Sequence, residues 1–136
     1  MKARAAAIAL IAFLGMMDTF YISFKRGSGQ VPPCHVTHGC SDVLTSKYST
    51  LGPIPLSWLG LAFYLSVFSC AILALTDAAN LLHLIFWPAL FGFLVSLSLT
   101  SIQAFVLHAY CEYCLLSALL VTSIFAVSAT VKKPVP

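Results

Sequence analysis

The sequence predicts an all-α integral membrane protein: a four-helix transmembrane bundle with an outer loop that carries a short helix. Of its 136 residues, 60% are hydrophobic and only 8% are charged, whereas globular chains carry roughly 25% charged residues. Almost all of this charge lies outside four long apolar stretches, as in membrane-spanning chains. The length suits a single domain, residues 1–136. No basic stripe interleaved with aromatic residues is present, so we expect no binding to nucleic acid.

The first predicted span covers about residues 5–24. The basic residues before it resemble the start of a secretory signal, but the apolar run is too long for one and no Ala-x-Ala cleavage site follows. We therefore expect a retained span. Asp18 lies within it, where a carboxylate is costly and often functional. Alternatively, Asp18 lies near the outer end of the span and is capped by Thr19 or Tyr21.

A polar segment, residues 25–54, follows the first span and holds several glycines and prolines. Within it, SDVLTSKYSTL predicts the start of a short helix with Ser41 as its N-cap. The second predicted span covers about residues 55–76. Its first residue, Pro55, is expected in the first turn of the helix, where proline is tolerated.

The third predicted span covers about residues 81–107 and follows a tight connection, DAAN. Pro88 within it predicts either a kink or the true start of the helix. The fourth span is expected at about residues 110–131. Polar side chains along the third span suit helix–helix contacts; they are Ser96, Ser98, Thr100, Ser101 and Gln103.

Four spans place both chain ends on one side of the membrane. Lys and Arg flank the terminal spans but also occur in the 25–54 loop, so the positive-inside rule gives only a small bias. We expect the termini in the cytoplasm, because the opposite orientation would put a cysteine-bearing loop in a reducing compartment. The loop and the start of the fourth span then share the outer side.

The five cysteines fall into two pairs and one isolated residue. Cys34 and Cys40 lie in the loop, while Cys111 and Cys114 begin the fourth span at i and i+3, on one helix face. A helix N-terminus favours a thiolate, the nucleophile of disulfide exchange. We expect Cys111 nearer water and Cys114 one turn deeper, where it can face an oxidant dissolved in the bilayer. Cys70, in the second span, is expected only to pack.

The loop pair also admits interpretations from other classes of protein. Cys34, His35, His38 and Cys40 would be the ligands of a metal-binding membrane protein. Their spacing fits neither usual pattern of zinc ligands, C-x2-4-C or H-x3-5-H, and a short loop poorly presents four tetrahedral ligands. We therefore expect no metal. A further alternative is a structural protein whose cysteines only staple its loops.

Taken in order, these features resemble the vitamin K epoxide reductase family in its bacterial branch. The matching motifs are the CHVTHGC loop, Ser46 six residues after Cys40, LGPIPLSWLG at the second span, and CEYCL at the fourth. GMMDTFYISF resembles the end of that branch's first span. The resemblance covers nearly the whole chain. The other quinone-linked disulfide-forming family, of the DsbB type, has its C-x-x-C in the first outer loop instead.

The resemblance implies a thiol:quinone oxidoreductase that drives disulfide-bond formation, with its redox site on the periplasmic side of the cell inner membrane. A thioredoxin-like (DsbA-like) partner would pass electrons to Cys34 and Cys40. Cys40 would exchange with Cys111, and the Cys111–Cys114 pair would reduce a quinone, either ubiquinone or menaquinone, beside Cys114. Many bacterial members carry a fused thioredoxin-like domain; because this chain stops at Pro136, we expect the partner in trans.

Three residues are expected to contact the quinone. Ser46 is placed near it by the resemblance, and Gln103 is within reach of a quinone carbonyl. Phe63, like Phe91 and Phe93, fits either a quinone slot or the packed core.

Two departures from the family favour an ordinary quinone over the alternative, thiol-driven reduction of vitamin K quinone or its epoxide. Ala118 replaces a tyrosine that the animal enzyme has four residues beyond its second C-x-x-C cysteine. Leu56 aligns with an asparagine near the start of that enzyme's second span.

Overall fold

The computed structural model describes residues 2–29, 50–51, 54–76, 81–108 and 110–130. Its long helices are α1 (Lys2–Gly27), α3 (Leu56–Thr76), α4 (Leu81–Ile102) and α5 (Glu112–Ala129). Each of these four helices is long and apolar enough to cross a membrane. The predicted all-α four-helix bundle is therefore confirmed, and the chain is a multi-pass membrane protein.

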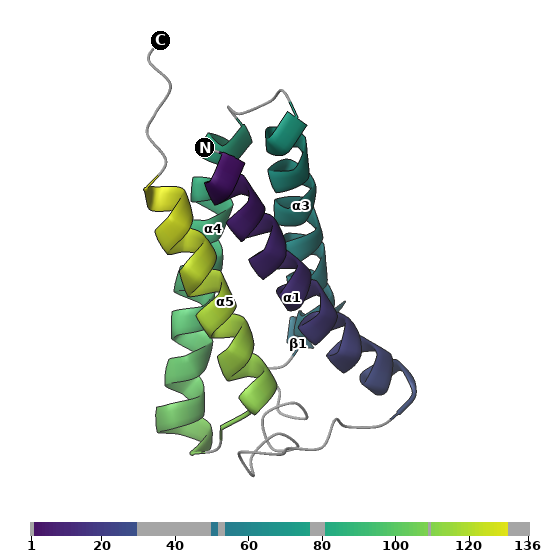
Figure 1. The fold of residues 1–136 in the computed structure, drawn as a ribbon. Coiled ribbons are helices and arrows are strands. Elements are labelled where there is room, and N and C mark those ends of the chain that lie inside the picture. The colour runs from purple at the N-terminus through teal and green to yellow at the C-terminus, as the bar shows by residue number, and fades with distance from the viewer. Residues whose placement is uncertain (1, 30–49, 52–53, 77–80, 109, 131–136) are drawn as a thin grey trace.

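The four helices form a closed ring in which each has two neighbours. α1 packs on α3 and α5, and α4 packs on the same two helices from the other side (Figure 1). α1 begins and α5 ends at one end of the bundle, as expected for four spans (Figure 1). The start of α5, where Cys111 and Cys114 lie, is at the opposite end.

The segment before α3 differs from the prediction. Two short strands, β1 (Thr50–Leu51) and β2 (Ile54–Pro55), pair antiparallel, with Thr50 opposite Pro55. The expected place of Pro55 in the first helical turn is therefore wrong, because Pro55 ends β2. Proline is tolerated there because β2 is an edge strand. The predicted short helix beginning at Ser41 lies outside the described residues, apart from its last two residues, which form β1.

Proline does not start the third span. α4 begins at Leu81 and contains Pro88 in its interior, so the later helix start is excluded. Proline has no N–H to donate, so the carbonyl of Leu84 loses its usual partner in the helix. After Ile102 the span continues as a π-helical turn, Gln103–Leu107.

Small side chains of α1 let the helices approach closely. Ala5, Ala9 and Ala12 are buried in the main core cluster, and Gly15 continues this row at helical spacing. Small residues favour close helix contacts in a bilayer, where the lipid offers no hydrophobic drive for association. Larger side chains from the other three helices fill the rest of this core: Tyr64, Val67, Ile85, Leu120, Val121 and Ile124.

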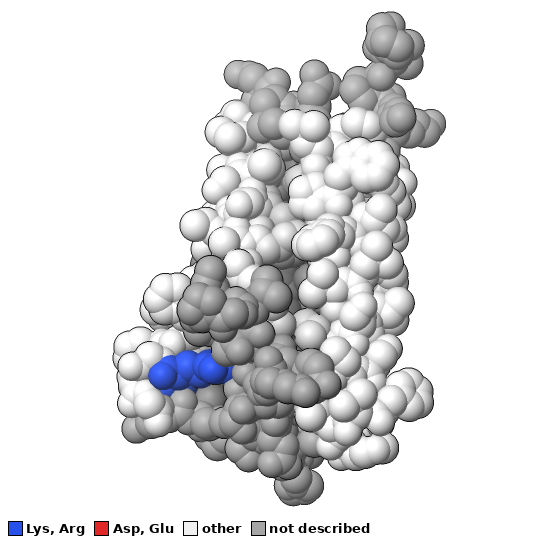
Figure 2. Space-filling model, turned by 180° about the vertical axis from the view of Figure 1, so that it is seen from behind, with Lys and Arg blue, Asp and Glu red and all other residues white. Residues whose placement is uncertain are grey.

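The outer surface suits contact with lipid. Large apolar side chains such as Phe20, Trp87 and Phe105 are exposed, and a soluble monomer rarely exposes so much apolar surface. Figure 2 shows one face on which the described residues carry Lys or Arg atoms only near one end of the molecule. The rest of that face, where it is described, lacks charge.

The contact between Gly15 and Tyr64 gives a test of this packing. A Cβ on Gly15 would overlap the Tyr64 ring, which is buried and held at its hydroxyl by Ser117. We expect Gly15→Ala to lower the free energy of unfolding by about 1–3 kcal/mol, as overpacked cores do. Unfolding in mixed detergent micelles, followed by circular dichroism, measures this change.

Gly27→Ala is the matched control, because nothing lies within 4 Å of a Cβ added there. We expect this variant to be as stable as the wild type or slightly more stable, since alanine favours a helix over glycine. Equal stability of the two variants would contradict the close contact between Gly15 and the Tyr64 ring.

Candidate functional site

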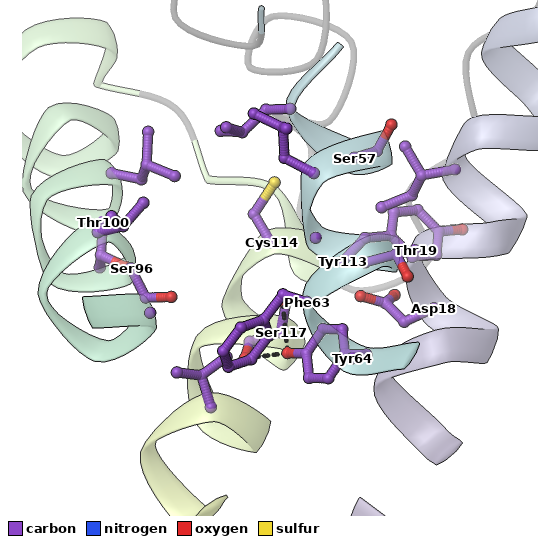
Figure 3. Close-up of a pocket in the computed structure, with 18 of the residues that line it drawn as sticks. Asp18, Thr19, Ser57, Phe63, Tyr64, Ser96, Thr100, Tyr113, Cys114 and Ser117 are labelled. Carbon is purple, nitrogen blue, oxygen red and sulfur yellow. Dashed lines mark hydrogen bonds between the residues drawn. The ribbon is translucent and has the colours of Figure 1, made fainter. Parts of the chain in front are cut away.

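A cavity of about 530 Å³ lies between the helices near the start of α5. All four long helices contribute side chains to it, and most of the lining is apolar. Figure 3 shows Asp18 and Thr19 reaching it from α1, Ser96 and Thr100 from α4, and Cys114 from α5. The volume falls in the range of small-molecule sites, which are typically apolar with a few placed polar groups.

The two cysteines at the start of α5 have different surroundings. Cys111 is the N-cap residue in an extended conformation, and its carbonyl accepts the Leu115 N–H at 3.0 Å, which starts the helix. Cys114 lies in the first turn and lines the cavity. Both are thiols in this structure. The pair therefore occupies the helix N-terminus, as predicted from its place at the head of the fourth apolar run.

The two cysteines differ in exposure. Cys111 is fully buried, at 0% exposure, against Ile22, Leu107 and Tyr113, whereas Cys114 is partly exposed and lines the cavity. The expectation that Cys111 lies nearer water and Cys114 one turn deeper stays a prediction. Position along a helix gives depth in the bundle, but packing from α1 and from the end of the third span decides exposure.

The Cys111 thiol interacts directly with Cys114. A hydrogen bond from Cys114 is the main cause that lowers the pKa of Cys111 below its ordinary value, and backbone N–H groups of Cys114 and Tyr113 act in the same direction. Burial and the nearby Asp18 oppose this effect. Cys111 is thus the sulfur that more readily forms the nucleophilic thiolate.

Gln103 fixes the backbone of Cys111. Its Oε1 accepts the Cys111 N–H at 3.0 Å in a buried hydrogen bond, and its side chain is only 3% exposed. The π-helical turn that begins at Gln103 ends at His108, a left-handed residue (φ 51°) whose N–H bonds the Gln103 carbonyl. Such π-helical turns often occur at functional sites. Gln103 also lines the cavity.

Of the residues predicted to contact a quinone, two are described. Phe63 and Gln103 both line the cavity. Their contact with a quinone stays a prediction. The remaining one, Ser46, lies outside the described residues, as do the loop cysteines Cys34 and Cys40. The proposed metal ligands His35 and His38 also lie there. In the described part of the chain, no group of three or more His, Cys, Asp or Glu could hold a metal ion.

Of the three phenylalanines that fit either a quinone slot or the packed core, two line the cavity and one packs in the core. Phe63 and Phe91 line the cavity. Phe93 instead stacks on Phe125, with ring centroids 5.2 Å apart, and packs against the main core. The alternation follows from helix geometry, because Phe91 and Phe93 lie about 200° apart around α4.

The polar residues of the third span divide in a similar way. Ser96 and Thr100 face the cavity, whereas Ser98 and Ser101 are exposed and bond the carbonyls of Leu94 and Leu97 in their own helix. Ser96, Thr100 and Gln103 share one helix face through their i, i+4, i+7 spacing. That face supplies the polar side of the cavity.

Tyr64 and Ser117 form a contact that the sequence did not suggest. The Tyr64 hydroxyl lies 2.9 Å from the Ser117 carbonyl and 2.8 Å from its hydroxyl, joining α3 to α5 at the cavity wall. Tyr21 and Tyr113, with ring centroids 5.6 Å apart, similarly join α1 to the first turn of α5. Their only signal in the sequence is a hydroxyl within an apolar run.

From the hydrogen bond between the two thiols we predict how the reactivity of Cys111 depends on pH. Cys114→Ala removes the hydrogen bond that stabilises the Cys111 thiolate, so we expect the pKa of Cys111 to rise. In chains whose other cysteines are alanine, reaction of Cys111 with a methanethiosulfonate reagent, followed against pH, should then begin at higher pH than in Cys114→Ser, which keeps a hydroxyl donor. Coincident pH profiles would contradict this account.

From the hydrogen bond between Gln103 and the Cys111 N–H we predict the rate of hydrogen exchange at that amide. Gln103→Met keeps the length of the side chain but removes the acceptor, which leaves the buried Cys111 N–H unpaired at a cost of about 1–3 kcal/mol. Hydrogen exchange at the Cys111 amide should become faster. Ser101→Ala, at an exposed residue of α4, is the control and should leave this amide unchanged; an equal effect of both variants would count against the role of Gln103.

A family model described as the vitamin K epoxide reductase family matches residues 6–129, nearly the whole chain. The match includes most of α1, the other three long helices and the Cys111–Cys114 pair. Proteins of this family are membrane oxidoreductases that couple thiol–disulfide chemistry to a quinone. With its four-helix bundle and a thiol pair beside an apolar cavity, the chain belongs to the vitamin K epoxide reductase family, as its motifs predicted.

Proposed function

We propose that the protein oxidises a thioredoxin-like partner acting in trans and delivers the electrons to ubiquinone or menaquinone. The partner's dithiol reduces the Cys34–Cys40 disulfide, and Cys40 then attacks Cys111 of the oxidised inner pair. Cys34 resolves the mixed disulfide by attacking Cys40, which leaves Cys111 and Cys114 as thiols. Each exchange breaks one disulfide and forms another, with thiolates as the only nucleophiles.

The position of Cys114 is the main support for the last step. Its side chain lines a cavity large enough for a quinone ring, beside the aromatic side chains of Phe63 and Phe91. Polar groups on the same face of α4, at Ser96 and Thr100, offer hydrogen bonds to quinone carbonyls. Oxidation of the two thiols releases two electrons and two protons, which convert the quinone to a quinol.

The different burial of the two sulfurs supports different reaction partners for them. Cys114 meets the cavity, whereas Cys111 is sealed by Ile22 and Leu107. Attack on Cys111 therefore requires a local displacement of these side chains, so that thiol exchange and quinone reduction do not compete at one sulfur. The lowered pKa of Cys111 makes it a good leaving group when Cys34 attacks Cys40 in the mixed disulfide.

The lining supports an ordinary quinone rather than the epoxide. Leu56, which stands where the animal enzyme has an asparagine, lines the cavity and offers no hydrogen bond there. Ala118 likewise carries no hydroxyl in place of the tyrosine. Both positions thus lack the polar group that the animal enzyme has there.

We further propose that the termini are cytoplasmic in the inner membrane and that the redox end faces the periplasm. The start of α1 and the end of α5 lie together, while Cys111 and Cys114 lie at the far end of the bundle (Figure 1). Disulfide formation requires an oxidising compartment at that end.

The relay is tested with purified protein in detergent, a reduced thioredoxin-like substrate and soluble ubiquinone and menaquinone analogues. Quinone absorbance should fall for the wild type and remain at the background rate for Cys114→Ala, which lacks the sulfur that faces the cavity. Cys70→Ala is the matched control, because Cys70 packs against the main core rather than the cavity. It should keep the wild-type rate.

Absence of turnover with both quinones in the wild type would overturn the proposal. Metal analysis of the purified chain would then test the alternative site at Cys34, His35, His38 and Cys40. Turnover that persists in Cys114→Ala would instead remove Cys114 from the reaction.

A further inference from the structure

Asp18 places a carboxyl group inside the same cavity as Cys114. It lies in the second half of α1 and lines the cavity from the wall opposite α4. Figure 3 shows its side chain reaching from α1 into the space that Cys114 enters from α5. The residue is only 8% exposed. Among the described residues that line the cavity, it alone carries a carboxyl group.

The Asp18 carboxyl group has one buried oxygen, Oδ2, without a hydrogen-bond partner among the described residues. The expected caps serve other groups: the Thr19 hydroxyl donates to the Gly15 carbonyl at 2.8 Å, and the Tyr21 ring packs on Tyr113. Neither of the expected caps therefore accounts for its burial.

Burial without a partner favours the neutral acid. An isolated carboxylate in apolar surroundings is far costlier than the protonated group, which is also able to donate a hydrogen bond. The electrostatic effect on the neighbouring thiol agrees, since a negative Asp18 raises the pKa of Cys111 and opposes its thiolate. A neutral Asp18 leaves that thiolate undisturbed.

Resting on the proposed function, we propose that Asp18 is a catalytic residue that donates a proton to the quinone as the Cys111–Cys114 pair is oxidised. Two electrons pass from the sulfurs to the quinone as the S–S bond forms. One quinone oxygen takes the proton of Asp18, and the resulting carboxylate takes the thiol proton of Cys114. The second oxygen takes a proton from solvent, which matches the proton that Cys111 released when it formed its thiolate. The products are a disulfide, a quinol and a neutral Asp18.

The test uses the full chain carrying Cys34→Ala and Cys40→Ala, so that only the inner pair is redox-active. The reduced protein is mixed with a soluble ubiquinone analogue, and one turnover is followed by quinone absorbance. Asp18→Asn keeps the shape but has no acidic proton, so we expect its rate at saturating quinone to fall about 100-fold, as for loss of a general acid. Quinone affinity should change by less than about threefold, since the hydrogen-bonding shape remains.

Two further measurements separate proton donation from a structural role. Reduction of the Cys111–Cys114 disulfide by dithiothreitol involves no quinone, so it should proceed at the same rate in Asp18→Asn. Asp18→Glu should recover part of the quinone-reduction rate. Ser128→Ala, at a buried polar residue near the other end of α5, is the control and should behave as the wild type throughout.

A probe of the unsubstituted chain covers the case in which Asp18→Asn does not fold. Dicyclohexylcarbodiimide modifies protonated carboxyl groups in apolar surroundings, and mass spectrometry locates the product. We expect modification at Asp18, protection by bound quinone, and loss of quinone reduction after labelling. An unlabelled Asp18, or a wild-type rate in Asp18→Asn, would overturn the role of Asp18 alone. A wild type that reduces no quinone would overturn the proposed function itself.

Discussion

The buried ring of Tyr64 is the constraint on which the bundle and its cavity both depend. The ring fills the space left by the missing side chain of Gly15 on α1, and its hydroxyl bonds Ser117 on α5. One side chain of α3 thus fixes the distances to two neighbouring helices. Because Tyr64 belongs to the core cluster and also lines the cavity, it forms the boundary between them. On one side the helices close around alanines; on the other they leave room for a ligand.

At the redox end, backbone geometry rather than side-chain packing sets the position of the thiols. The π-helical turn and the left-handed His108 end the third span so that Gln103 meets the N–H of Cys111. That hydrogen bond satisfies one of the amides that a helix start leaves unpaired. The first turn of α5 then places Cys114 on the cavity side. A π-helical turn has more residues than an α-helical one, so it changes the direction in which the chain leaves Gln103 toward Cys111.

The membrane made most of the fold predictable. A bilayer demands helices of about 20 apolar residues with every backbone group paired internally, so four apolar runs were enough to predict the bundle. The position of Cys111 and Cys114 at the head of the fourth apolar run was likewise enough to place them at a helix start. The burial of Cys111 was not predictable, because Ile22 comes from a distant helix. The packing of Tyr64 was not predictable either, because it depends on Gly15 lying opposite the ring. The strand at Pro55 depends on pairing with Thr50, which local propensity does not reveal.

The chemistry of a quinone explains why the cavity needs a group that thiol exchange does not. Disulfide exchange conserves charge at sulfur and proceeds wherever a thiolate approaches. Quinone reduction instead places two electrons on oxygen atoms in an apolar space, where an unprotonated product is poorly solvated. A proton must therefore arrive with the electrons. The polar face at Ser96, Thr100 and Gln103 offers hydrogen bonds but no acidic proton at neutral pH. We propose that Asp18, on the opposite wall, supplies this proton; because it lines the same cavity as Cys114, the source of protons and the source of electrons share one cavity.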